Sequence, residues 1–223
     1  LHPGHARPHP RGTLLTPLTL APGATVMFTG DSITDCRRME TDEPLGYGYP
    51  LHVAGQWGLS HLDRPVRWLN SGIAGNKVLD LEPRWQHDVL DAGAGVVSIL
   101  VGINDAFWHT YAEDGRMIPA AEYRDGYDRL LAPLAAAGTA LILIEPFLLP
   151  VSDLQRRWRY DVDEKIEVVR GLAKTYEAHL LAADEMFTGL AATTGPEYWA
   201  PDGVHPSPAG HAALAAAWLR LVE

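Results

Sequence analysis

Short apolar runs alternate with longer helical stretches along most of this 223-residue chain. The apolar runs have the length of buried strands, and the stretches between them have the length of helices. This alternation is typical of a parallel sheet covered by helices on both faces, with right-handed crossovers. The expected strands are residues 26–28, 66–69, 96–101, 140–145 and 179–182, the expected helices are residues 49–59, 78–90, 121–137, 161–176 and 209–222, and the longer loops are residues 39–44 and 145–159.

Length and composition indicate a single α/β domain. An apolar content of 47% can fill a sizeable core, and we find no internal repeat and no dividing linker. Residues 1–12 are rich in Pro, His and Arg, which predicts a flexible N-terminal arm ahead of a domain over residues 13–223. The arm has no apolar segment typical of a secretory signal. Its three histidines are better explained by a tag-like or packing arm than by a metal site, so no metal is expected.

The charge balance limits the partners of this chain. There are 18 basic and 28 acidic residues, a net charge of −10, which argues against nucleic acid as a partner. Since no apolar stretch reaches membrane-spanning length, no membrane partner is expected. The single cysteine, Cys36, excludes an internal disulfide and is compatible with a reducing compartment. We therefore expect a cytoplasmic location, with a removed signal peptide as the alternative.

A serine stands where the first expected strand ends. Residues 30–35 read Gly-Asp-Ser-Ile-Thr-Asp and follow the apolar run 25–29. Ligands bind at the carboxyl ends of strands in open α/β sheets, and Gly30 allows the chain to turn sharply there. On its own Ser32 would be read as a helix N-cap, but the other motifs make it a candidate nucleophile.

A candidate base for this serine lies near the other end of the chain. Residues 202–206, Asp-Gly-Val-His-Pro, place a carboxylate and an imidazole three residues apart before the last helix. A serine hydroxyl needs a neighbouring base, and histidine titrates in the appropriate range. A carboxylate fixes the tautomer of such a histidine. Asp202 and His205 can serve only if the fold brings them to Ser32; otherwise they are a helix cap and a surface histidine.

Glycine and asparagine follow two further expected strands. Residues 70–76 read Asn-Ser-Gly-Ile-Ala-Gly-Asn, and residues 102–105 read Gly-Ile-Asn-Asp. A glycine N–H and an asparagine amide are neutral donors that can stabilise an oxyanion. Asn104 and Asp105 are also typical turn residues. We interpret Asn104 as functional and Asp105 as structural.

Together these four blocks resemble the SGNH hydrolases, also called the GDSL esterase/lipase family, although that family usually has leucine where Ile33 stands. The resemblance implies a three-layer flavodoxin-like fold with a five-stranded parallel sheet, and a reaction that needs no cofactor. It implies that Ser32 is the nucleophile, His205 the base and Asp202 its orienting carboxylate. The implied oxyanion donors are the N–H groups of Ser32 and Gly75 and the side chain of Asn104. Gly72 competes with Gly75, but the family's spacing from Asn70 favours Gly75.

A closer similarity is to the acetyl xylan esterase branch of that family, carried by residues 30–37, 46–49, 70–76, 84–85 and 102–105. It implies a small-molecule or oligosaccharide ester substrate, with acetyl groups removed from xylan-derived sugars. Members of this branch often assemble, which implies a homo-oligomer. We expect Asp31, Trp108 and Trp199 near the substrate. Core packing is the alternative for the two tryptophans, and support of the Ser32 loop is the alternative for Asp31.

Other functions are compatible with parts of the sequence. A lipid ester or thioester hydrolase would use the same fold with a longer apolar groove. A non-catalytic carbohydrate-binding domain would not need Ser32, Asn104, Asp202 and His205 together. The Gly-x-Gly-x-x-Gly pattern of nucleotide binding is absent after the first strand. Metal-dependent hydrolysis lacks an evident third ligand beside Asp202 and His205.

Overall fold

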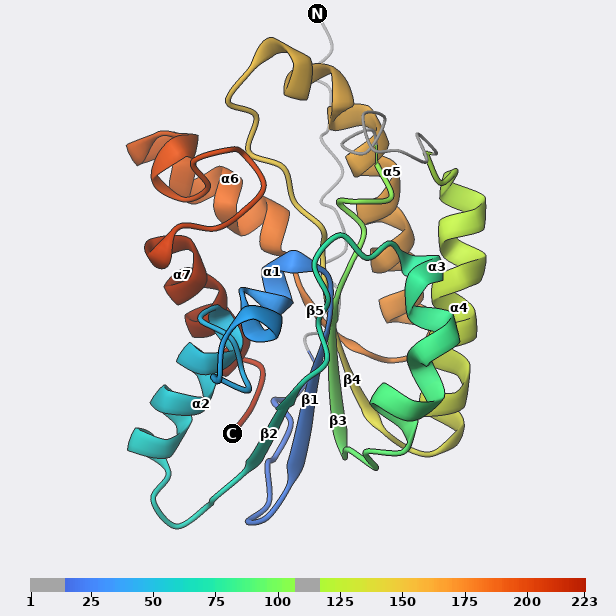
Figure 1. The fold of residues 1–223 in the computed structure, drawn as a ribbon, viewed down its shortest axis with the longest axis vertical. Coiled ribbons are helices and arrows are strands. Elements are labelled where there is room, and N and C mark those ends of the chain that lie inside the picture. Colours follow the sequence, from blue (N-terminus) through green and yellow to red (C-terminus); the bar gives the residue numbers. More distant parts are fainter. Residues whose placement is uncertain (1–14, 107–116) are drawn as a thin grey trace, which may run out of the picture.

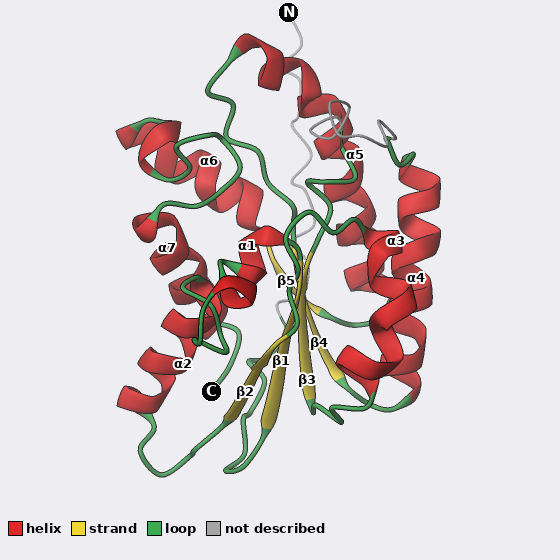
Figure 2. Cartoon of the chain, in the orientation of Figure 1, coloured by secondary structure: helices red, strands yellow, loops and turns green. Residues whose placement is uncertain are grey.

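A central parallel sheet organises the chain in the computed structural model, which describes residues 15–106 and 117–223. Its strand order is β2-β1-β3-β4-β5, the order of flavodoxin-like folds, so the expected fold class is confirmed (Figure 2). The boundaries of the strands lie within two residues of the predicted ones. They are β1 (Thr25–Gly30), β2 (Arg67–Asn70), β3 (Val96–Leu100), β4 (Ala140–Ile144) and β5 (His179–Leu181).

Helices cover both faces of the sheet (Figure 1). Helices α2, α6 and α7 lie on one face, and α3, α4 and α5 lie on the other. Each face buries its own apolar cluster, one around Phe28 and Trp218 and the other around Trp85 and Tyr123. The helices are α1 (Ser32–Asp35), α2 (Tyr49–Ser60), α3 (Val78–Leu81), α4 (Ala120–Ala136), α5 (Asp153–Thr175), α6 (Ala183–Thr194) and α7 (Pro208–Leu219).

The prediction of a loop over residues 145–159 is wrong from Asp153 onward, because α5 begins at that residue. Ser152 caps this helix by accepting a hydrogen bond from the Gln155 N–H. Its first turns are stabilised by exposed ion pairs such as Arg156–Asp153, spaced three residues apart. The segment is too polar for an apolar pattern to reveal it.

Two other helical regions differ from the sequence expectation. The helix expected over residues 78–90 is divided into α3, a 3₁₀ turn (Glu82–Arg84) and a π turn (Gln86–Leu90), with Pro83 at the start of the 3₁₀ turn. Pro83 lacks the N–H that a continuous helix would use. Helix α6 was not predicted.

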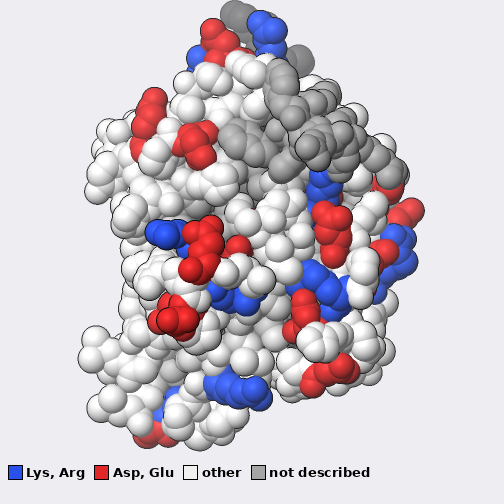
Figure 3. Space-filling model, viewed as in Figure 1, with Lys and Arg blue, Asp and Glu red and all other residues white. Residues whose placement is uncertain are grey.

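The surface and the helices bear on the partner predictions. On the face drawn in Figure 3, basic and acidic side chains are interspersed over the described residues, without an extended basic patch. None of the helices within residues 15–106 and 117–223 is long and apolar enough to cross a bilayer. The expected N-terminal arm, residues 1–12, lies outside the described residues.

Candidate active site

Ser32 begins helix α1 directly after strand β1. Asp31 caps this helix, its Oδ1 accepting a hydrogen bond from the Ile33 N–H at 3.0 Å. Gly30 makes the tight exit from the sheet possible: its φ is 143°, and a Cβ there would lie 1.8 Å from the carbonyl oxygen of Leu100. Only glycine permits this approach of β1 to β3. The local sequence therefore places the Ser32 hydroxyl at the carboxyl edge of the sheet.

The fold brings the Asp202–His205 loop to this serine across 173 positions of sequence. Ser32 Oγ lies 3.0 Å from His205 Nε2, and His205 Nδ1 lies 2.7 Å from Asp202 Oδ2. The other carboxylate oxygen of Asp202 accepts the N–H groups of Val204 and His205, at 2.9 and 2.7 Å. An ionised carboxylate only accepts, so Nδ1 carries the proton and Nε2 is left to accept from Ser32.

The electrostatics of the pair suit a base. Burial opposes ionisation of Asp202, but the hydrogen bonds from His205 and Val204 lower the pKa of Asp202 to about 2. The hydrogen bond to Asp202 raises the pKa of His205, against partial burial. Both side chains are about half exposed, at 47% each. The arrangement can accept a proton from Ser32 and stabilise the resulting imidazolium.

Backbone donors lie on the loop after β2, and the structure distinguishes the two competing glycines. The Gly72 N–H already donates to Asn70 Oδ1 at 2.8 Å. The exposed Gly75 N–H has no acceptor among the described residues, and neither has the Ser32 N–H. Gly75, rather than Gly72, therefore has an N–H available for an oxyanion.

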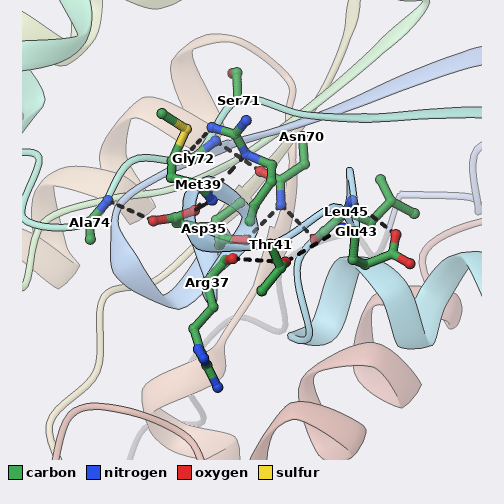
Figure 4. Close-up of polar contacts among 12 residues, drawn as sticks. Asp35, Arg37, Met39, Thr41, Glu43, Leu45, Asn70, Ser71, Gly72 and Ala74 are labelled. Atoms are coloured by element: carbon green, nitrogen blue, oxygen red, sulfur yellow. Dashed lines mark hydrogen bonds and ion pairs between the residues drawn. The ribbon is translucent and has the colours of Figure 1, made fainter.

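Three side chains hold this loop, residues 70–76, in place (Figure 4). Asp35 Oδ2 accepts the Ala74 N–H at 3.2 Å, and an Arg38 guanidinium nitrogen donates to the Gly72 carbonyl at 2.7 Å. The Asn70 amide donates to the carbonyls of Thr34 and Leu45, at 2.7 and 2.8 Å. The loop is thus fastened to the segment that follows Ser32. No sequence pattern indicated these contacts.

Asn104 and Asp105 follow β3 and lie at the same edge of the sheet. Asn104 Nδ2 donates to the carbonyl of Asn76 at 3.0 Å, which orients its amide beside the 70–76 loop. Asp105 is fully buried, and its carboxylate accepts the Val78 N–H at the start of α3. The structural interpretation of Asp105 fits this contact.

The structure describes two of the three residues that were expected near the substrate, and both make contacts within the fold. Asp31 has no exposed surface, so its carboxylate cannot contact a substrate in this structure; it supports the Ser32 loop instead. Trp199 is partly buried against the core and its indole N–H donates to Thr194 Oγ1 at 2.7 Å, which fits the packing alternative. Trp108 lies outside the described residues.

A second pair that resembles a nucleophile and a base lies close by. Cys36 Sγ is 3.5 Å from His211 Nε2, but His211 Nδ1 accepts the Tyr49 N–H at 3.1 Å. In the neutral ring Nε2 then carries the proton and cannot take one from the thiol. Burial lowers the pKa of His211 to about 4, so the ring is neutral at pH 7. Cys36 is therefore a structural thiol.

The geometry at the carboxyl edge agrees with a family match over most of the chain. Residues 28–213 match the model of the GDSL-like lipase/acylhydrolase family. The chain belongs to this family. The resemblance noted from the four sequence blocks is thereby confirmed. As a member of the GDSL-like family of acylhydrolases, the chain is a carboxylic ester hydrolase.

Relatives within the GDSL-like family are similar over nearly their whole length. An acetylxylan esterase of Geobacillus stearothermophilus is 34% identical over 212 residues, which cover 91% of this chain and 95% of that protein. The crystal structure of an acetylxylan esterase from the same organism, Axe2, superposes with a TM-score of 0.82 at 32% identity, covering 91% of this chain and 95% of that one.

Solved variants of Axe2 give a pattern to compare with this site. Three of them, described as catalytic mutants, replace a serine, an aspartate and a histidine with alanine. The aspartate and the histidine are three positions apart in that protein. The same spacing separates Asp202 from His205 here.

Proposed function

We propose that this GDSL-like enzyme is a serine esterase that removes small acyl groups, acetyl above all, from xylan-derived sugars. The observation that carries the proposal is the hydrogen-bonded chain from Ser32 Oγ through His205 to Asp202. A base within 3.0 Å of a serine hydroxyl, itself oriented by a carboxylate, is the arrangement that activates serine for acyl transfer.

In the first half-reaction, Ser32 Oγ attacks the ester carbonyl carbon while its proton passes to His205 Nε2. Asp202 stabilises the imidazolium that forms and keeps the ring in its tautomer. The carbonyl oxygen becomes an oxyanion, and the N–H groups of Ser32 and Gly75 with the Asn104 amide stabilise it. When the intermediate collapses, the bond between the acyl carbon and the sugar oxygen breaks. The sugar oxygen takes the proton from His205 and leaves as a hydroxyl group, and the acyl group stays on Ser32.

In the second half-reaction a water molecule takes the place of the sugar. His205 accepts a proton from the water as its oxygen attacks the acyl carbon. The same donors stabilise the second oxyanion. Collapse returns the proton to Ser32 Oγ and releases the carboxylic acid. In this scheme the groups that move protons and stabilise the oxyanion are side chains and backbone N–H groups of this chain.

The acetyl and xylan assignment is supported by the similarity to the acetylxylan esterase of Geobacillus stearothermophilus. A related solved variant is described as an acetyl-xylooligosaccharide esterase. The exposure of His205 and Asp202 is compatible with a bulky sugar ring at the leaving-group side. A homo-oligomer and a cytoplasmic location stay predictions; sedimentation of the purified protein and cell fractionation would test them.

The test compares turnover of 4-nitrophenyl acetate and 4-nitrophenyl octanoate by the wild type and by Ser32→Ala. The matched control is Ser60→Ala, because Ser60 is an exposed serine at the end of α2. Acetate release from acetylated xylo-oligosaccharides is then measured for the same three proteins.

We expect wild type and Ser60→Ala to turn over the acetate and the acetylated sugar, and Ser32→Ala to lose nearly all turnover while remaining folded. A preference for octanoate would indicate that the substrate is a lipid ester and not a sugar ester. A folded wild type without turnover of any of these esters would favour the carbohydrate-binding alternative. Substantial turnover in Ser32→Ala would sink the assignment of the nucleophile.

A further inference from the structure

Arg84 contacts both ends of the loop that carries Gly75. It is the last residue of the 3₁₀ turn Glu82–Arg84, and only 16% of its side chain is exposed. Its NH1 nitrogen donates to the carbonyl of Ser71 at 2.8 Å, and its Nε donates to Asn76 Oδ1 at 3.1 Å. The guanidinium thus spans the loop from its second residue to its last.

The same contacts connect this loop to the Asn104 amide. Asn76 offers its side-chain oxygen to Arg84 and its backbone carbonyl to Asn104 Nδ2, at 3.1 and 3.0 Å. Asn76 is the neighbour of Gly75 in sequence. Two of the three oxyanion donors proposed above are therefore held together through one residue, and Arg84 holds that residue.

The position of Arg84 is itself fixed. Asp88, one helical turn further on, accepts a hydrogen bond from Arg84 NH1 at 2.7 Å and is 24% exposed. Because a guanidinium is planar and presents its donors in a fixed fork, it can set the separation of two acceptors. A lysine ammonium in the same place has a single nitrogen on a flexible stem and cannot do so.

We propose that Arg84 is a positioning residue of the oxyanion site, which sets the Gly75 N–H relative to the Asn104 amide through Ser71 and Asn76. This inference rests on the proposed function. Arg84 does not touch the reacting atoms in this assignment. It acts through the loop, so its loss weakens stabilisation of the transition state more than binding of the ester.

The test uses Arg84→Met, which keeps the length of the side chain and removes its donors. We expect kcat on 4-nitrophenyl acetate to fall about tenfold to a hundredfold, with KM within about twofold. Arg129→Met is the matched control, since Arg129 pairs with Glu82 of the same turn at 2.5 Å and has no hydrogen bond to residues 70–76 within the described parts of the chain. Its kcat should stay at the wild-type value.

A double-mutant cycle separates positioning from general destabilisation. If Arg84 acts through the donors, Arg84→Met costs a smaller factor in kcat when Asn104→Ala is already present. Equal factors in the two backgrounds would overturn the inference. So would an unchanged kcat in Arg84→Met.

Arg84→Lys keeps a cation beside Asp88 and guards against misfolding of the methionine variant. We expect it to melt near the wild-type temperature and still lose kcat, because one nitrogen cannot serve both acceptors. A wild-type kcat in this variant would show that the two acceptors do not require a guanidinium, and would overturn the inference. An active wild type with fully active Arg84 variants overturns only this inference, whereas a wild type without esterase activity overturns the proposed function as well.

Discussion

The side-chain amide of Gln155 binds the backbone of Asp202. Gln155 Nε2 donates to the Asp202 carbonyl at 2.6 Å, and Gln155 Oε1 accepts the Val151 N–H at 2.8 Å. Gln155 is buried, and its side chain packs against Gly203, where an added Cβ would come within 2.8 Å of its amide oxygen. One glutamine of α5 therefore connects the Asp202–His205 loop to the segment that precedes this helix.

Replacing this glutamine should loosen the loop. In Gln155→Met the Val151 N–H and the Asp202 carbonyl lose their partner, so we expect the free energy of unfolding to fall by about 1–3 kcal/mol. A small displacement of His205 from Ser32 should also lower kcat by about tenfold. Urea denaturation and ester turnover measure the two effects. Gln86→Met is the control, because Gln86 is exposed and its side chain donates to Asp91 at the surface. Equal effects in both variants would contradict the role of Gln155.

The pH dependence of kcat/KM should report the bond between Asp202 and His205. Only neutral imidazole accepts the Ser32 proton, so activity is lost as the pH falls through the pKa of His205. Because the hydrogen bond to Asp202 raises this pKa above its usual 6.5, the loss should begin at a higher pH than for an isolated histidine. In Asp202→Asn we expect the acid limb to move to lower pH and kcat to fall by about 10⁴-fold, since the tautomer is no longer fixed.

A histidine remote from the site provides the control for this pH profile. His61 ends α2 and stacks on Trp57 with ring centroids 3.8 Å apart. His61→Gln should leave the acid limb in place. An Asp202→Asn limb that coincides with the wild-type limb would show that another group governs it.

Asn104 offers a direct test of the oxyanion assignment. Asn104→Ala removes one donor, and we expect kcat to fall roughly a hundredfold to a thousandfold while KM changes little. Asn104→Asp keeps the shape but places negative charge toward the oxyanion, so its kcat should be lower still. Steady-state turnover of 4-nitrophenyl acetate measures both. If Asn104→Ala kept the wild-type kcat, the third donor would have to be sought elsewhere.

The residues of the site that could be predicted from sequence are those that belong to short local motifs. Ser32 follows a strand and a glycine, and Asp202 and His205 share one short loop. Their roles as nucleophile, base and carboxylate could therefore be predicted, although their contact could not. Their approach to within 3.0 Å depends on packing, which no local pattern records. The choice of Gly75 over Gly72 followed from family spacing, and the structure adds its reason, because Asn70 occupies the Gly72 N–H.

The supporting residues could not be predicted in the same way. Gln155 meets Asp202 across 47 positions, and Arg84 meets Ser71 across 13, through turns whose geometry is set by tertiary contacts. The first turns of α5 carry few apolar residues, so periodicity did not reveal the helix that holds Gln155. Asp31 was expected near the substrate, with support of the Ser32 loop as the alternative, and its buried side chain caps α1.

Asp31 is a buried carboxyl group, and its contribution to the free energy of unfolding depends on pH. Its Oδ2 has no hydrogen-bond partner in the part of the chain that the structure describes. Burial raises the pKa of Asp31 to about 7, against smaller opposing effects of the Ile33 N–H and His205. The unfolded chain releases this proton near the usual value of 3.8. Between these two values the folded state binds more protons than the unfolded state, so stability falls as the pH rises and levels off above about 7.

Asp31→Asn removes this titration while keeping an oxygen for the Ile33 N–H. We expect the variant to gain stability relative to the wild type as the pH is raised from about 5 to 8, by on the order of 2–3 kcal/mol. Urea denaturation at several pH values measures the difference. Asp63→Asn is the control for replacing a carboxylate with an amide, because Asp63 lies at an exposed position. A constant difference for Asp31→Asn would mean that Asp31 is ionised in the folded protein throughout this range, with its charge compensated by a neighbour such as His205.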